Sequence, residues 1–188
     1  MPSGPQSEIP VVALCGFMAA GKSTVGRELA SLLRWRFIDL DCEIVCRSGQ
    51  PIHEIFAQRG EARFREMESE SLRHVLQQVA TPTVIALGGG TFAQPQNAEL
   101  LTGRGARVVF LELPVELLLE RCRNAANRSP QNPRPLSADA EAFCALYEQR
   151  LPHYRKAKLT VHTRSKSAPQ VAQEIAKLLR LGIRPVKR

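Results

Sequence analysis

Eight consecutive residues near the N-terminus have the composition and spacing of a phosphate-binding loop. Residues 16–23, GFMAAGKS, fit the pattern G-x-x-x-x-G-K-[ST] in full. In such a loop the backbone N–H groups converge on phosphate oxygens, and the following helix directs its positive N-terminal end at the same anion. The amine of Lys22 would reach the β- and γ-phosphates, and the hydroxyl of Ser23 would ligate Mg²⁺. These residues predict a site for a nucleoside triphosphate and magnesium, rather than a glycine-rich turn that is only structural.

Two carboxylates follow the next apolar segment of the chain. Asp39 and Asp41 end the stretch WRFIDLD, which has the composition of a strand. Residues two apart on a strand point to the same face, and ligands bind at the carboxyl ends of the strands in an open parallel sheet. One carboxylate could support the metal, directly or through water, while the other holds or deprotonates an acceptor hydroxyl. The alternative is that one of them only caps the following helix.

Apolar runs and helical spacing alternate along the chain, which indicates an α/β fold. The expected strands cover residues 9–15, 35–40, 83–87, 107–113 and 159–162, and the expected helices cover residues 22–33, 41–46, 52–79, 114–123, 138–156 and 169–181. We expect a break in the third helix near Gly60, and a long exposed loop over the proline-containing residues 124–135. The alternation favours a parallel sheet with helices on both faces.

The positive charge is concentrated at one end of the chain. The 188 residues carry a net charge of +8, and their number and composition are those of one globular domain. Residues 150–188 hold 11 Lys or Arg residues and a single acidic one. Such a segment suggests a nucleic-acid partner, but no aromatic-rich motif supports that partner class.

Sequence features also bear on the compartment. No run of about 18 apolar residues exists, so we expect no membrane-spanning helix. The first ten residues lack the basic and hydrophobic regions of a signal peptide. The five cysteines are scattered and odd in number, which argues against a disulfide framework and favours a cytoplasmic protein.

Six motifs in a fixed order give the chain a family resemblance. They are GFMAAGKSTVGRELA, FIDLD, IHEIFAQRGEARFREME, ALGGGT, RPL and YEQRLPHY. Together they cover about residues 10–180 and resemble the shikimate kinases, which are small P-loop kinases of the nucleoside-monophosphate-kinase type. The resemblance implies transfer of the γ-phosphate of ATP to the 3-hydroxyl of shikimate, in the route to chorismate and the aromatic amino acids.

The resemblance also implies an architecture. The expected fold is a three-layer P-loop kinase fold, in which helices flank a five-stranded parallel sheet of order 2-3-1-4-5. We expect a single domain over residues 10–182 with a mobile lid at about 121–137. Residues 1–9 would form a disordered tail and residues 183–188 a basic tail, and a monomer is expected.

Site residues follow from the positions that match the family motifs. The implied ATP-binding residues are Gly16, Ala19, Ala20, Gly21, Lys22, Ser23, Thr24, Arg121 and Arg134, and the implied metal site is Ser23 with Asp39. The implied shikimate-binding residues are Asp41, Phe56, Phe64, Arg65, Gly88, Gly89, Gly90, Pro135, Leu136 and Arg150. Lys22, Asp41 and Arg134 are the implied catalytic residues, with Asp41 as the candidate base. A planar guanidinium suits a carboxylate, so Arg65 and Arg150 would clamp that of the substrate.

The chain departs from the family pattern at a few positions. Ala19 stands where many members carry glycine, a mild change unless the backbone there needs a positive φ. The lid is proline-rich, which leaves Arg123 and Arg128 without an assigned role. Cys42 and Cys46 are four residues apart, and we expect small buried hydrophobic side chains there rather than metal ligands.

Three other functions remain open on the sequence. Another small P-loop metabolite kinase, such as a gluconate kinase, would share the loop but should lack the FR, GGG and RPL motifs together. A degenerate P-loop protein could sense ATP without catalysis, although the retained Lys22, Ser23, Asp39 and Asp41 speak against it. A nucleic-acid binder would show salt-sensitive affinity.

Overall fold

Five parallel strands form the central sheet of the computed structural model, which describes residues 9–128 and 139–182. The strands are β1 Val11–Cys15, β2 Arg36–Asp39, β3 Thr83–Ala86, β4 Arg107–Glu112 and β5 Leu159–His162. Their order in the sheet is β2-β3-β1-β4-β5, as the family resemblance implied. Every residue of the central strand β1 is buried, which fits an apolar strand covered on both faces.

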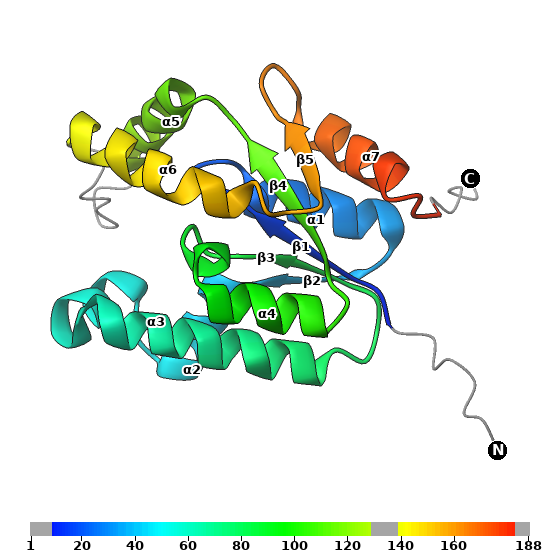
Figure 1. Ribbon diagram of the computed structural model, residues 1–188, viewed down its shortest axis with the longest axis horizontal. Helices are drawn as coiled ribbons and strands as arrows, with labels where there is room; N and C mark the ends of the chain where they lie inside the picture. Colours follow the sequence, from blue (N-terminus) through cyan, green and yellow to red (C-terminus); the bar gives the residue numbers. More distant parts are fainter. Residues whose placement is uncertain (1–8, 129–138, 183–188) are drawn as a thin grey trace.

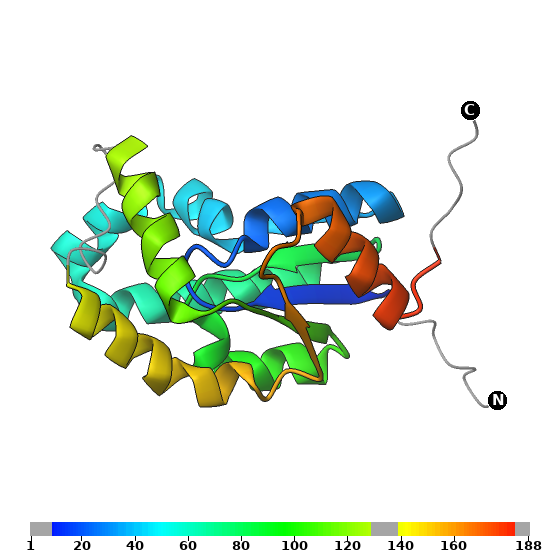
Figure 2. The same cartoon turned by 90° about the horizontal axis from the view of Figure 1, so that it is seen from above.

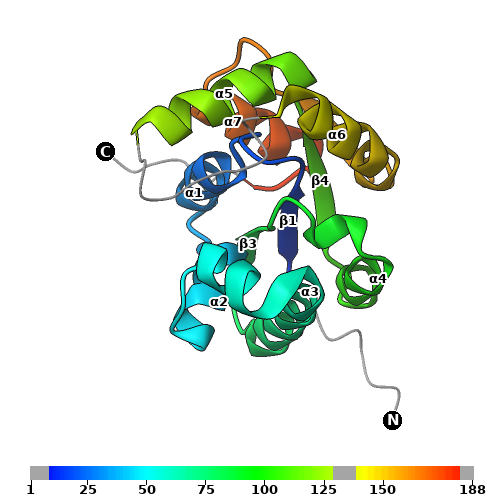
Figure 3. The same cartoon turned by 90° about the vertical axis from the view of Figure 1, so that its left-hand side faces the viewer.

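Helices cover both faces of this sheet. They are α1 Lys22–Leu33, α2 Leu40–Ser48, α3 Ile52–Gln78, α4 Pro95–Gly103, α5 Val115–Arg128, α6 Ala140–Tyr154 and α7 Ala168–Leu178, with a 3-10 turn η1 at Thr91–Ala93. Helices α1 and α7 lie side by side on one face and α4 lies on the other, so the molecule has three layers (Figures 1 and 3).

The strand register brings three chain segments to one end of the sheet. Because the pairing is parallel, β1 ends beside the end of β3, and Asp39 at the end of β2 is in register with Ala86 of β3. The segments that follow these strands therefore leave the sheet together. Helices α2, α5 and α6 and the first half of α3 gather at this same end of the molecule (Figure 2).

Most predicted elements are confirmed, and α3 contains the expected break. The backbone of Gly60 has φ 73° and ψ 172°, which is not helical. Helix α4 was not predicted, although Pro95 at its first turn is a typical start signal.

The loop predicted over residues 124–135 is wrong in its first part. Helix α5 continues to Arg128, because the alanines of this stretch favour a helix and the first proline after residue 123 is Pro130. The rest of the predicted loop, from residue 129 on, lies outside the described residues, as do residues 1–8 and 183–188 of the predicted tails.

The prediction that Cys42 and Cys46 are buried is also wrong. Both are exposed, because Leu40 and Ile44 form the buried side of α2 and the cysteines lie on its outer side. Within residues 9–128 and 139–182 there is no cluster of three Cys, His, Asp or Glu side chains that could hold a metal ion.

Candidate active site

The loop between β1 and α1 has the backbone of a phosphate-binding turn. Gly16 has φ 141°, and a side chain there would place its Cβ 2.8 Å from the carbonyl oxygen of Leu111, so only glycine fits. Gly21 has φ 90° and precedes α1, whose first turn holds no acidic residue. The positive end of α1 therefore faces the loop without an acidic side chain in its own first turn.

Ala19 adopts a left-handed backbone with φ 61°. The condition under which the replacement of glycine would not be mild is therefore met, because a Cβ in the left-handed region costs about 1–2 kcal/mol. This backbone strain therefore lies within the loop that would bind phosphate.

Two cationic side chains lie on the loop. Lys22 Nζ donates hydrogen bonds to the carbonyl oxygens of Gly16 at 3.0 Å and Phe17 at 2.9 Å. Arg121 of α5 donates from Nη1 to the carbonyl oxygen of Ala19 at 3.5 Å, across 102 residues of sequence. The structure thus brings Arg121, predicted to contact ATP, to the phosphate-binding loop.

Phe17 anchors the loop to α6. Its buried ring packs edge-on against Phe143 at a centroid distance of 5.0 Å and against Tyr147 at 5.4 Å. The guanidinium carbon of Arg150 lies 5.8 Å from the centre of the same ring. The loop and the predicted carboxylate-binding arginine therefore share one rigid aromatic support.

The two aspartates, Asp39 and Asp41, differ in their surroundings. Asp39 caps α2, since its Oδ1 accepts from the backbone N–H of Asp41 at 3.1 Å and of Cys42 at 3.4 Å. The alternative that one of the two aspartates caps the following helix is therefore confirmed for Asp39. Desolvation raises the pKa of Asp41 to about 6; the positive charge of Lys22 opposes this shift, and the negative charges of Asp39 and Glu68 add to it.

The turn Gly88–Gly90 contacts three predicted substrate-binding residues in succession. A Cβ on the first glycine would lie 2.8 Å from Asp41 Oδ1. The carbonyl oxygen of the second glycine accepts from Arg150 Nη1 at 3.5 Å. A Cβ on the third glycine would lie 2.6 Å from Arg65 Nη1. Larger residues at Gly88 or Gly90 would displace Asp41 or Arg65, so the small turn lets one carboxylate and two guanidinium groups meet around it.

This turn also borders the phosphate-binding loop. A Cβ on Gly89 would lie 3.4 Å from the backbone nitrogen of Met18. The hydroxyl of Tyr154, on α6, donates to the carbonyl oxygen of Gly89, and burial raises the pKa of that tyrosine. Tyr154 was not predicted as a site residue, although YEQRLPHY includes it.

Arg65 is held by two glutamates of its own helix. Its Nη2 donates to Glu61 Oε1 at 3.0 Å, and its Nη1 donates to Oε2 of the buried Glu68 at 3.0 Å. The second oxygen of Glu68 accepts from the hydroxyl of Thr91 at 2.7 Å. Sequence reasoning missed Glu68 and Thr91; the spacing of three residues between Arg65 and Glu68 on a helix was the available signal.

Two predicted aromatic residues meet across the break in α3. The rings of Phe56 and Phe64 lie 4.4 Å apart between centroids, and the guanidinium carbon of Arg65 is 5.2 Å from the Phe64 ring. Phe64 is 4% exposed and Phe56 37% exposed. Their arrangement gives the site an apolar wall with an accessible rim.

The remaining predicted residues divide into two groups. Gly16, Ala19, Ala20, Gly21, Lys22, Ser23 and Thr24 all belong to the loop or the first turn of α1. Arg134, Pro135 and Leu136 lie outside the described residues, and the side chain of Arg128 is not described either.

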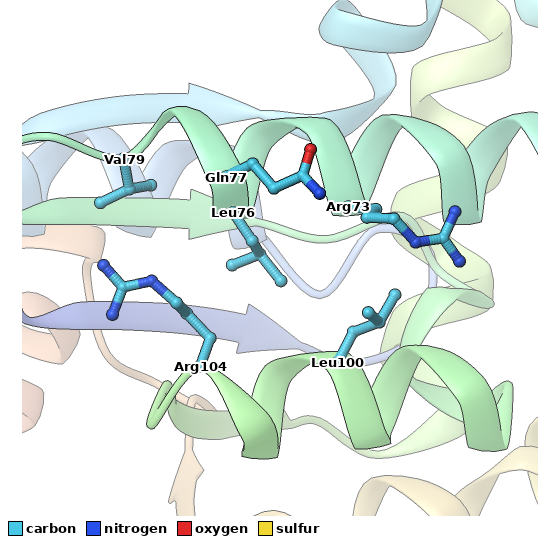
Figure 4. Close-up of a pocket in the computed structure, with 6 residues that line it drawn as sticks. All are labelled: Arg73, Leu76, Gln77, Val79, Leu100 and Arg104. Atoms are coloured by element: carbon cyan, nitrogen blue, oxygen red, sulfur yellow. The ribbon is translucent and has the colours of Figure 1, made fainter.

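A separate hollow of about 450 Å³ lies between the second half of α3 and α4 (Figure 4). Its lining residues are Arg73, Leu76, Gln77, Val79, Leu100 and Arg104. Leu76 and Leu100 point into it from the two helices (Figure 4). The predicted site residues that the structure describes lie elsewhere, around the phosphate-binding loop and the glycine turn.

Residues 18–180 of the chain match one family model, described as shikimate kinase. The shikimate kinases of Thermus thermophilus and Geobacter sulfurreducens are 41% identical over 170 residues and 42% identical over 171 residues. These alignments cover 89% and 90% of the chain and equal shares of the two relatives. The chain belongs to the shikimate kinase family. Its reaction is the ATP-dependent phosphorylation of shikimate, and the family uses ATP with a divalent metal.

Solved structures agree with the family. A shikimate kinase from Acinetobacter baumannii in complex with shikimate is 38% identical, with a TM-score of 0.81 over 92% of this chain and 93% of that one. A gluconokinase from Sinorhizobium meliloti is 17% identical with a TM-score of 0.57, a likeness that shows the fold alone. None of the helices within residues 9–128 and 139–182 has the length and apolar character needed to cross a bilayer.

Proposed function

We propose that shikimate binds around the turn Gly88–Gly90, with ATP on the loop of residues 16–23. The observation that carries this proposal is the meeting of Asp41, Arg150 and Arg65 around that turn, next to the loop. Shikimate is a polyol with one carboxylate, so it needs guanidinium groups at one end and a carboxylate acceptor at the other. Arg65 and Arg150 supply the first, and Asp41 supplies the second.

Asp41 acts on the hydroxyl that attacks the γ-phosphate. The 3-hydroxyl of shikimate donates a hydrogen bond to the Asp41 carboxylate and passes its proton there as the new O–P bond forms. The bond between the β–γ bridging oxygen and the γ-phosphorus breaks, and ADP leaves with that oxygen. Lys22 turns from the loop carbonyls to the phosphate oxygens, where its charge stabilises the transition state.

Magnesium is the metal we propose for this site. The donors that fit it are the Ser23 hydroxyl, at the first turn of α1, and Asp39. Asp39 uses Oδ1 for both capping hydrogen bonds, which is compatible with metal support from Oδ2, directly or through water. The ion would neutralise phosphate charge; few protein ligands are needed, because Mg²⁺ keeps waters and binds phosphate oxygens.

Closure over ATP is assigned to residues of the predicted lid. Arg134 would approach the phosphates, and Pro135 and Leu136 would cover the shikimate ring. Arg121 would contact the nucleotide from α5, and its contact with the loop supports this. The monomeric state, the absence of a nucleic-acid partner and the cytoplasmic location stay predictions.

The function is tested by a coupled assay that compares shikimate, quinate and gluconate as acceptors. We expect shikimate alone to stimulate ADP formation strongly. Asp41→Asn should then lower kcat by about 10²–10⁴-fold, because it removes the proton acceptor. Its affinity for ATP, measured by equilibrium titration, should stay near the wild-type value. A kcat of Asp41→Asn close to the wild-type value would contradict the assigned role.

A further inference from the structure

The substrate-facing arginine is the end of a buried polar chain that crosses three elements. Arg65 Nη1 donates to Glu68 Oε2 at 3.0 Å within α3. Glu68 Oε1 accepts from the hydroxyl of Thr91, in η1, at 2.7 Å. Asn97 of α4 donates from Nδ2 to the carbonyl oxygen of Thr91 at 3.1 Å. Glu68 is 1% exposed, while Thr91 and Asn97 are fully buried.

The Thr91 hydroxyl is held in one place from several sides. The Thr91 backbone N–H donates to the carbonyl oxygen of Gly88 at 3.3 Å, while Asn97 fixes its carbonyl. A Cβ on Gly88 would lie 2.9 Å from Thr91 Oγ1 and 2.7 Å from Glu68 Oε1, so these atoms are packed tightly against the glycine turn. The hydroxyl therefore has little freedom to leave Glu68.

Glu68 needs this donor because it is a buried carboxylate. A buried charge is tolerated only when its oxygens have hydrogen bonds or an opposite charge. Arg65 Nη1 satisfies one oxygen and Thr91 satisfies the other. Without the hydroxyl, Glu68 could turn toward Arg65 with both oxygens or take up water, and either change would move the guanidinium away from the Gly90 end of the turn.

We propose that Thr91 is a positioning residue for shikimate binding: its hydroxyl orients Glu68, and Glu68 aims Arg65 at the substrate carboxylate. This inference rests on the proposed role of Arg65 as a carboxylate clamp. As a positioning residue, Thr91 acts through Glu68 and Arg65 and does not touch the reacting atoms. Its effect therefore falls on the KM for shikimate, and not on the KM for ATP.

The test compares Thr91→Val with the matched variant Thr83→Val. Both threonines are fully buried and donate one side-chain hydrogen bond. Thr83, the first residue of β3, donates from Oγ1 to the carbonyl oxygen of Thr81 at 2.7 Å. We expect Thr91→Val to raise the KM for shikimate about fivefold to tenfold, with kcat and the KM for ATP within about twofold. Thr91→Ser, which keeps the hydroxyl, should restore the wild-type KM, and Thr83→Val should leave it unchanged.

A double-mutant cycle shows whether Thr91 acts through Arg65. In an Arg65→Ala background, Thr91→Val should change the KM for shikimate by less than about twofold, because the group it positions is gone. Methyl shikimate, which lacks the carboxylate charge, should likewise give similar KM values with Thr91→Val and wild-type enzyme. Thr91→Ala removes the same hydroxyl and carries the test if Thr91→Val does not fold.

The outcomes separate this inference from the proposed function. An unchanged KM for shikimate in Arg65→Ala overturns the carboxylate clamp itself. A raised KM in Arg65→Ala together with an unchanged KM in Thr91→Val overturns only the role of Thr91. Additive effects of the two substitutions, or an equal rise in the KM for ATP, would also overturn it, because they indicate a general structural defect.

Discussion

At the scale of single residues, Ala19 stores strain that glycine would release. Its φ of 61° lies in the left-handed region, which costs about 1–2 kcal/mol for a residue with a Cβ. Glycine also has greater freedom in the unfolded chain, and this offsets about 0.4–1 kcal/mol of the stability gained by releasing the strain. We therefore expect Ala19→Gly to raise the free energy of unfolding by about 0.5–1 kcal/mol in urea denaturation.

Ala20 provides the control for that substitution. It follows Ala19 in the same loop, is 2% exposed and has no positive φ. Ala20→Gly should lower the free energy of unfolding, because it removes a buried methyl group and adds unfolded-state freedom. If both variants shift stability in the same direction, backbone strain at Ala19 is not the cause.

In the proposed mechanism, the ionisation of Asp41 sets the pH dependence of the reaction. Its pKa is raised to about 6, mainly by desolvation, and only the carboxylate form can accept the hydroxyl proton. Below pH 6 the protonated, inactive form dominates, so kcat/KM for shikimate should fall about tenfold per pH unit and level off above pH 7. A pH series at saturating ATP measures this limb.

The raised pKa of Asp41 also makes the stability of the folded protein depend on pH. A carboxyl group whose pKa is higher in the folded state than in the unfolded state favours folding at low pH, and this contribution is lost as the pH rises through 6. Asp41→Asn should therefore unfold at higher urea concentration than the wild type at pH 7.5, with a smaller difference at pH 5. An acid limb near pH 4 in the pH profile of kcat/KM for shikimate would contradict the proposed environment of Asp41.

At the scale of elements, strands and the phosphate-binding loop could be predicted because their signals are local. Helix α1 was predicted with its observed bounds, since Gly21 and the apolar spacing after it mark it clearly. Helix α4 was missed because only Asn97 and Leu101 are buried along it, which leaves a weak apolar pattern. The link from Glu68 to Thr91 could not be predicted, because it joins residues 23 apart that only the folded chain brings together.

The break in helix α3 depends on the backbone conformation of Gly60. Its φ of 73° with ψ of 172° lies in a region open essentially only to glycine. Gly60→Ala should lower the free energy of unfolding by about 1–3 kcal/mol, measured by thermal or urea unfolding. It should also raise the KM for shikimate, because Phe56 and Phe64 meet across this break.

Gly103 is the matched control on a regular helix. It ends α4, has no positive φ, and a Cβ there would meet nothing within 4 Å. Gly103→Ala should therefore leave stability unchanged or raise it by up to about 1 kcal/mol, with no change in KM. A Gly60→Ala variant as stable as Gly103→Ala would mean that the break is not required.

At the scale of the whole molecule, the net charge is +8, and three cations in the described part of the basic C-terminal segment have partners within the protein. Arg150 lies at the glycine turn, Arg155 pairs with Glu112, and Lys166 pairs with Glu174. The described part of the basic C-terminal segment thus contributes one residue to the site and two to surface ion pairs. This distribution favours ATP and a small carboxylate as the anions that the enzyme binds.

The site exists only when the whole sheet is formed, so substrate binding and global unfolding are linked. Arg150 reaches Gly89 across 61 residues of sequence, and Arg121 reaches Ala19 across 102.

A ligand that binds only the folded state, at a concentration 100 times its Kd, stabilises that state by about 2.7 kcal/mol. For a chain of this size we therefore expect shikimate to raise Tm by about 5–10 °C in differential scanning calorimetry. Gluconate at the same concentration should leave Tm unchanged. Shikimate should raise the Tm of Arg65→Ala by less than that of the wild type, because one of the two guanidinium contacts to the carboxylate is lost. An equal shift with gluconate would show that the stabilisation does not come from recognition at the glycine turn.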